Sequence, residues 1–145
     1  MQNRFKFRAW NTMTKTMKEI AQLTFDKDTI QSRCYDKNKT TLHLLFQKHI
    51  ILMQSTGLKD KTGKLIYEGD ILKFYAQSII DAMAREPLKE RIGVAVWNEE
   101  ELKFDVSVDN GKNVVPNLCK KTDDNNFEII GNIYENPELL EVKCK

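Results

Sequence analysis

The chain has 145 residues, which is enough for one ordinary domain or for two small ones that share a core. Hydrophobic residues make up 41% and charged residues 30%, a balance that excludes a disordered chain as the default interpretation. No run of about 18 apolar residues occurs in the sequence, so we expect no membrane span.

The charged residues are unevenly distributed, although the formal net charge is only +2. Residues 1–48 carry 10 basic and 4 acidic groups, whereas residues 98–145 carry 6 and 11. A basic first third could face nucleic acid. We favour the alternative that it pairs with the acidic last third, within one chain or between subunits, because its basic residues form no dense run.

The cysteines Cys34, Cys119 and Cys144 form no close pair in the sequence. An odd number of cysteines, in a short chain without a secretory signal, indicates reduced thiols. We therefore expect a soluble protein of the cytoplasm.

The first residues predict a β-hairpin region. Residues 4–10 alternate with period two and predict a half-buried strand. Residues 17–25 predict a second strand, and the polar residues 31–41 predict a loop. This loop is the predicted boundary between an N-terminal hairpin region, residues 1–40, and a barrel core, residues 41–145.

The middle of the chain predicts strands around a turn. Residues 41–54 are long enough for a helix or two strands, and within them residues 50–53 predict a buried strand. Residues 57–64 are rich in turn formers. Residues 65–75 predict a strand with a kink or bulge at Gly69.

Residues 77–86 predict a short amphipathic helix inserted between strands. Its apolar residues Ile79, Ile80 and Met83 repeat at helical spacing, and Pro87 interrupts the pattern. This stripe either covers an open end of the barrel or docks a partner, and the core role is favoured.

The last third predicts further strands. Residues 92–97 predict one, and residues 102–108 show the clearest alternation in the chain. Residues 109–111 (Asp-Asn-Gly) predict a hairpin turn to a returning strand. Residues 127–134 predict the final strand with a bulge at Gly131.

Beyond the last strand, the sequence predicts a capped helical turn. Asn136 is a favourable cap, and Pro137 suits the first helical position. Glu138 follows near the positive end of the helix dipole.

Three blocks, taken together, resemble a known family: residues 6–10 (KFRAW), residues 52–71 (LMQSTGLKDKTGKLIYEGDI) and residues 130–140 (IGNIYENPELL). In this order they resemble the YopX-like family of bacteriophage and prophage proteins, and the resemblance covers most of the chain. It implies a small phage-encoded protein of the bacterial cytoplasm, without an assigned activity, that contains a small barrel of the Src-homology-3 type and self-associates. It supplies no catalytic residues.

The residues of the shared motifs look structural. The glycines suit backbone geometry, and Asp60 and Asp70 can bond neighbouring amides in turns. The set comprises Gly57, Asp60, Gly63, Tyr67, Glu68, Gly69, Asp70, Gly131, Asn132, Tyr134, Asn136 and Pro137. Pattern and resemblance together predict a mainly β fold, a β-rich α+β protein with a hairpin region, a small barrel and a short helical insertion.

Metal binding and phosphate binding are both disfavoured. Cys34, His43 and His49 have a spacing that fits no common zinc pattern. Gly57 to Lys64 contains two glycines and a lysine, but Leu65 follows where a phosphate loop needs Ser or Thr. We expect no metal and no cofactor.

Catalysis is also disfavoured. Asp60, Glu68 and Asp70 are close in sequence and could serve acid–base chemistry or bind a divalent ion. Nothing beside them supplies a nucleophile, and turn or bulge roles explain them. We therefore expect no enzyme.

Two functions remain as hypotheses. The first is a non-catalytic accessory protein that forms a homo-oligomer or binds a phage or host protein. The second is a nucleic-acid-binding module in which three cations hold phosphate and an aromatic residue stacks on a base; its residues would be Arg4, Lys6, Arg8 and Trp10. The alternative for these four is a solvated outer strand face with Trp10 packed at its end, so nucleic acid is not favoured.

Overall fold

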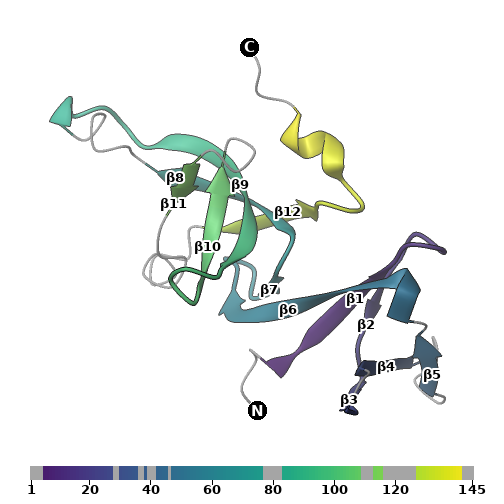
Figure 1. Ribbon diagram of the computed structural model, residues 1–145. Helices are drawn as coiled ribbons and strands as arrows, with labels where there is room; N and C mark the ends of the chain where they lie inside the picture. Colours follow the sequence, from purple (N-terminus) through teal and green to yellow (C-terminus); the bar gives the residue numbers. More distant parts are fainter. Residues whose placement is uncertain are drawn as a thin grey trace. The chain divides into compact units, whose positions relative to one another are not determined.

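The computed structural model describes residues 5–27, 30–35, 38, 42–45, 47–76, 83–108, 113–115 and 127–141. Within these residues the chain is mainly β and forms three antiparallel sheets (Figure 1). The mainly β prediction is confirmed. The chain divides into two compact units, an N-terminal unit (Met1–Ser55) and a C-terminal unit (Thr56–Lys145). The division falls within a strand, β6, and thus later in the chain than the predicted loop.

The N-terminal unit holds two small sheets. In the first, β1 (Phe7–Asn11) pairs with β2 (Thr16–Glu19) and with the first half of β6 (Ile50–Lys59). The second has the order β3 (Gln22–Phe25), β4 (Ile30–Tyr35) and β5 (Leu42–Leu45). A short 3₁₀ helix, η2 (Gln47–His49), precedes β6. The buried cluster of this unit comprises Ala9, Cys34 and Leu45, against which Ile20, Ile50 and Leu52 pack.

The exposure of β1 differs from the predicted alternation. Arg8 is only 9% exposed and Trp10 only 6%, although the alternation predicts both for an outer face. Ala9, between them, is fully buried. β1 lies between β2 and β6, and a central strand can be covered on both faces. Alternation of charged and apolar residues then no longer reports exposure.

Two predictions for the N-terminal unit are wrong. Residues 17–25 form two strands, β2 and β3, which belong to different sheets. Residues 30–35, which lie largely within the predicted loop, form β4, the central strand of its sheet. In β4 the buried residues are Ser32 and Cys34, so small inward side chains obscure the period-two pattern.

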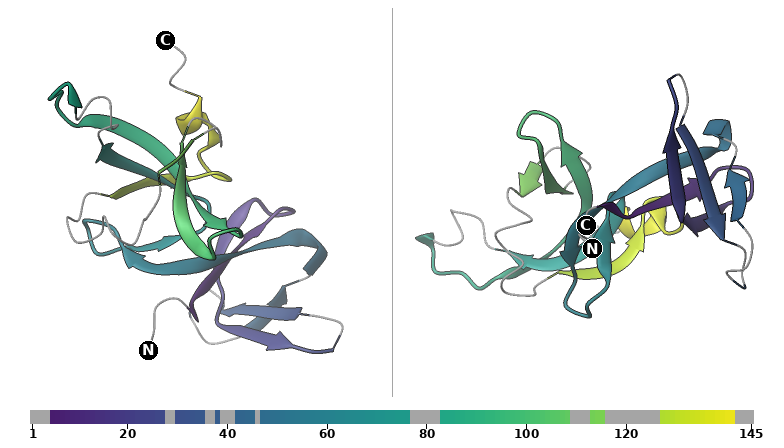
Figure 2. Two further views of the ribbon diagram at one scale, coloured as in Figure 1. Left: turned by 60° about the vertical axis from the view of Figure 1, so that its left-hand side comes forward. Right: turned by 90° about the horizontal axis from the view of Figure 1, so that it is seen from below.

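The C-terminal unit is built on a five-stranded sheet with the order β11-β10-β9-β8-β12. The sheet is curled into a half-barrel (Figures 1 and 2). Its strands are β8 (Asp70–Ala76), β9 (Lys89–Asn98), β10 (Lys103–Val108), β11 (Asn113–Val115) and β12 (Glu128–Asn132). A short strand, β7 (Leu65–Tyr67), pairs with β6 at the edge of the four-stranded sheet, whose order is β2-β1-β6-β7.

The core of the C-terminal unit lies on one face of the curled sheet. The rings of Phe74 and Phe127 lie 5.2 Å apart between centroids. Burial of such side chains contributes roughly 1.5–3 kcal/mol each. The cluster comprises Ile66, Leu72, Phe74, Ala76, Ala95, Phe104, Val106, Val108 and Phe127.

The turn and bulge predictions for this unit are confirmed in part. Gly63 lies in the predicted turn with φ 86°, whereas Gly57, with φ 83°, lies within β6. Residues 65–75 do not form one kinked strand, because β7 and β8 belong to different sheets and Gly69, with φ 78°, lies in the turn between them. The register of β12 against β8 shifts between Ile129 and Gly131, which is the predicted bulge. β10 and β11 pair as a hairpin, whereas its predicted turn at 109–111 lies outside the described residues.

The prediction for the start of β10 is wrong. Leu102 does not share the buried face of Phe104, Val106 and Val108, since it is 74% exposed. It has φ 51° and belongs to the turn before the strand.

The predicted helix over 77–86 is not shown. Residues 77–82, including Ile79 and Ile80, lie outside the described residues. Within residues 83–86, Met83 is helical and residues 84–85 form a turn. Among the residues that the structure describes, no helix has the length and hydropathy that a membrane span requires.

The C-terminal turn is present as a 3₁₀ helix, η5 (Pro137–Leu140), with proline at its start. The side chain of Asn136 makes no capping hydrogen bond, contrary to the prediction. It packs instead against Gly131, where a Cβ atom would lie only 2.6 Å from the Asn136 Oδ1 atom. Glycine at 131 thus makes room for this asparagine.

Candidate functional site

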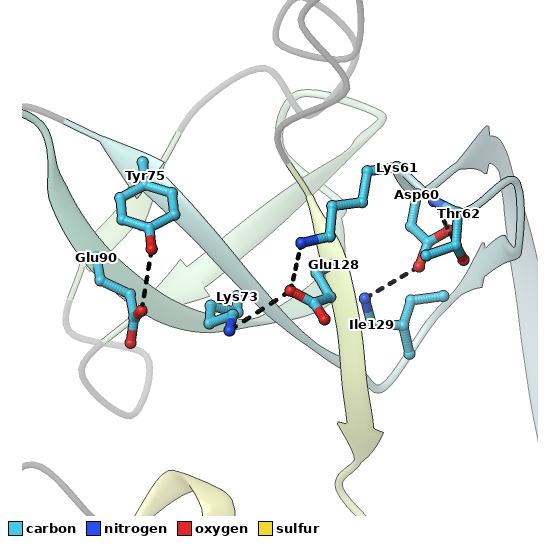
Figure 3. Close-up of polar contacts among 8 residues, drawn as sticks. All are labelled: Asp60, Lys61, Thr62, Lys73, Tyr75, Glu90, Glu128 and Ile129. Atoms are coloured by element: carbon cyan, nitrogen blue, oxygen red, sulfur yellow. Dashed lines mark hydrogen bonds and ion pairs between the residues drawn. The ribbon is translucent and has the colours of Figure 1, made fainter.

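Asp60 organises the turn between β6 and β7. Its Oδ1 atom accepts hydrogen bonds from the Thr62 amide (2.9 Å), the Thr62 hydroxyl (2.7 Å) and the Lys64 amide (2.9 Å). Its Oδ2 atom accepts one from the amide of Ile129 in β12, at 3.2 Å (Figure 3). The side chain is 3% exposed, so these donors replace the water that a carboxylate needs.

The hydrogen bonds also set the ionisation of Asp60. Burial raises the pKa of this carboxyl, but the hydrogen bonds from Thr62, Ile129 and Lys64 together outweigh that effect. The net result is a pKa below the ordinary value. A carboxylate held in this way remains ionised and is suited to accepting hydrogen bonds.

A row of ionic contacts lies beside this turn, across β8, β9 and β12 (Figure 3). The Glu128 Oε2 atom lies 2.6 Å from the Lys61 Nζ atom and 3.4 Å from that of Lys73. The hydrogen bond between Lys61 and Glu128 lowers the pKa of the glutamate and raises the pKa of the lysine. Tyr75 donates a hydrogen bond to Glu90 at 3.3 Å. These side chains are partly exposed, so each pair contributes little stability.

Two further motif residues serve turns. The Asp70 Oδ2 atom, in a side chain only 1% exposed, accepts a hydrogen bond from the Tyr67 amide at 2.8 Å. The Asn132 Oδ1 atom accepts from the amides of Tyr134 (3.1 Å) and Glu135 (3.0 Å). Asp60, Asp70 and Asn132 therefore act as acceptors that fix backbone turns.

One buried carboxylate was not singled out by the sequence patterns. Asp105 in β10 is 1% exposed and accepts a hydrogen bond from the Asn98 side chain at 2.9 Å. The Lys103 Nζ atom lies 3.6 Å from its other oxygen. The only sequence signal is an aspartate within a strand, a position where aspartate is disfavoured.

The residues considered for a metal site are not gathered into one. Cys34 in β4 lies opposite His43 in β5, while His49 belongs to η2. Cys34 is buried, whereas His43 is exposed. Across the described ranges, no three His, Cys, Asp or Glu side chains are grouped as metal ligands.

The residues considered for nucleic acid do not share an exposed face. Lys6 is exposed, but Arg8 and Trp10 are buried, and Arg4 lies outside the described residues. Of the three residues considered for partner contact, only Met83 is described, and it is 82% exposed.

Comparisons with known proteins agree with the resemblance seen in the sequence. Protein EF1440 from Enterococcus faecalis, known from its crystal structure, is similar to this chain with a TM-score of 0.59 and 27% sequence identity. The match covers 93% of this chain and 96% of that one. No curated protein matches. The model of the YopX protein family matches residues 6–141, so this chain belongs to the YopX family.

Proposed function

We propose that this chain is a non-catalytic accessory protein of a bacteriophage or prophage, which associates with further copies of itself and docks a phage or host protein. It would act in the cytoplasm of the bacterial host. In this proposal the curled sheet belongs to a small barrel of the Src-homology-3 type.

The opposite charge of the two units carries the proposal. The N-terminal unit has 10 basic and 4 acidic residues, a net charge of +6. The C-terminal unit has 13 basic and 17 acidic residues, a net charge of −4. Regions of opposite charge attract between copies, so head-to-tail association is electrostatically favourable.

The bonding of the motif carboxylates supports a non-catalytic role. Asp60 and Asp70 are buried and accept hydrogen bonds from backbone amides. Groups used in this way hold turns together, and they need no reaction to explain their presence. Burial of Arg8 and Trp10 gives no support to the nucleic-acid alternative.

Static light scattering on the full chain tests the proposal. A single chain has a mass of 16.9 kDa. We expect a larger mass at about 0.1 M salt and a smaller one at about 1 M, because the screening length falls from about 10 Å to about 3 Å. A mass of one chain at both salt concentrations would count against self-association.

A further inference from the structure

The closed end of the β9–β10 hairpin exposes two large apolar side chains. Trp97 in β9 is 42% exposed, and Leu102 in the turn is 74% exposed. The ring of Trp97 packs edge-on against that of Phe104, with 5.0 Å between centroids. Trp97 is thus held in place by a buried ring while much of its surface faces outward, as in an anchor residue of a protein interface.

The turn at this end is ordered by its own side chains. The Asn98 Oδ1 atom accepts hydrogen bonds from the amides of Glu100 (3.0 Å) and Glu101 (3.1 Å). The Asn98 amide group in turn donates to the buried Asp105. A surface ordered before binding loses less entropy when it binds.

Leucine at position 102 is not explained by the turn. Its φ of 51° is in the left-handed region, where glycine or asparagine is favoured. With 74% of its surface exposed, it also contributes little to the core. A contact outside this chain would account for an apolar side chain at this position.

The charges around the two apolar residues indicate the partner. Glu99, Glu100 and Glu101 are all exposed at the turn, and Glu101 forms an ion pair with Lys103. An apolar centre with a charged rim is the usual composition of a protein interface. Glu99 and Glu100 favour a basic partner, and the N-terminal unit of this same chain has a net charge of +6.

We infer that the closed end of the β9–β10 hairpin, residues 97–102, binds the basic N-terminal unit of a second copy of the chain. The inference rests on the proposed self-association and names its surface. Trp97 and Leu102 supply the apolar contact, and Glu99 and Glu100 orient the basic unit and favour it over acidic surfaces.

Sedimentation velocity on full-length charge variants tests the position of the surface. The variant Glu99→Lys with Glu100→Lys is compared with Glu138→Lys and Glu141→Lys, which change the net charge equally at exposed sites in and beside η5. We expect the hairpin variant to weaken association about tenfold more than the control. Equal weakening would overturn the hairpin surface but leave charge-driven self-association standing. A wild type that is monomeric at every concentration would overturn both.

A second variant tests the apolar contact. Leu102→Asn keeps a residue that tolerates positive φ, so the fold should persist and thermal stability should not fall. Its control is Leu88→Asn, at another apolar residue of this unit that is 58% exposed. We expect about tenfold weaker association for Leu102→Asn and no change for Leu88→Asn. Unchanged association of a folded Leu102→Asn variant would overturn the inference.

Discussion

The Asp60 side chain accepts a hydrogen bond from the backbone amide of Ile129, which lies 69 residues further along the chain. Next to it, the Lys61 amide donates to the Phe127 carbonyl at 2.8 Å. These two bonds join the turn after β6 to β12, the edge strand of the curled sheet. An edge strand presents backbone groups that need partners, and this turn supplies them for part of β12.

Removal of the Asp60 carboxylate should therefore destabilise the C-terminal unit. Asp60→Ala leaves the amides of Thr62, Lys64 and Ile129 without this acceptor, so we expect a loss of about 3 kcal/mol in the free energy of unfolding. Urea unfolding measures this loss. The control is Asp26→Ala, whose exposed carboxylate accepts only a bond from its neighbour's amide in the described structure, with an expected change within about 0.5 kcal/mol. Equal losses in the two variants would contradict the role of Asp60.

The lowered pKa of Asp60 predicts a pH dependence. Because the folded pKa lies below the unfolded one, the ionised carboxylate stabilises the fold fully above about pH 3.8, and this contribution disappears as the pH falls through the folded pKa. The stability difference between wild type and Asp60→Asn should therefore shrink below pH 3.8. Glu128 also has a lowered pKa but is present in both proteins, so the difference isolates Asp60. A difference that stays constant through the acid range would refute this linkage.

Alanine substitutions at two glycines distinguish a loss of stability caused by steric overlap from one caused by backbone conformation. A Cβ atom at Gly93 would lie 2.5 Å from the Val106 Cγ1 atom and 2.7 Å from the Ser107 carbonyl oxygen. We expect Gly93→Ala to cost about 2 kcal/mol or more. At Gly63 a Cβ atom meets nothing within 4 Å, but φ is +86°. We expect Gly63→Ala to cost about 1 kcal/mol. Urea unfolding that ranks the two in the opposite order would contradict the packing of β9 on β10.

Ser32 offers a stabilising substitution in the N-terminal unit. Its side chain is fully buried, and its hydroxyl has no hydrogen-bond partner among the described residues. Since a buried hydroxyl without a partner is unfavourable, we expect Ser32→Ala to raise the free energy of unfolding by about 1 kcal/mol. Ser55→Ala is the control at a serine that is equally buried and has further interactions, so no gain is expected there. A clear loss of stability in Ser32→Ala would show that the hydroxyl is bonded.

Much of the fold could be predicted from local patterns, because alternation reports a strand that has one covered face. The buried apolar residues Phe104, Val106 and Val108 of β10 illustrate this. The pattern failed at β4, where Ser32 is the inward residue, and at β1, where Arg8 and Trp10 are both buried. Coverage of a second face depends on chain segments distant in sequence, which local periodicity does not report.

In the candidate site, too, the local contacts could be predicted from the sequence and the long-range contacts could not. The bonds of Asp60 to the Thr62 and Lys64 amides are local, and a turn aspartate predicts them. The bond to Ile129 and the contact of Glu128 with Lys73 require the register of β12 against β8. That register includes a bulge, so side chains distant in sequence could not be matched from spacing alone.

The account depends on Asp60 being an ionised acceptor that secures the scaffold. The most direct measurement is an NMR titration of the Asp60 side-chain carboxyl carbon in the folded protein. The hydrogen bonds from Thr62, Lys64 and Ile129 predict a titration midpoint below 3.8. A midpoint at or above that value would show that the carboxylate is not held by these donors, and it would contradict the structural role assigned to the family motif.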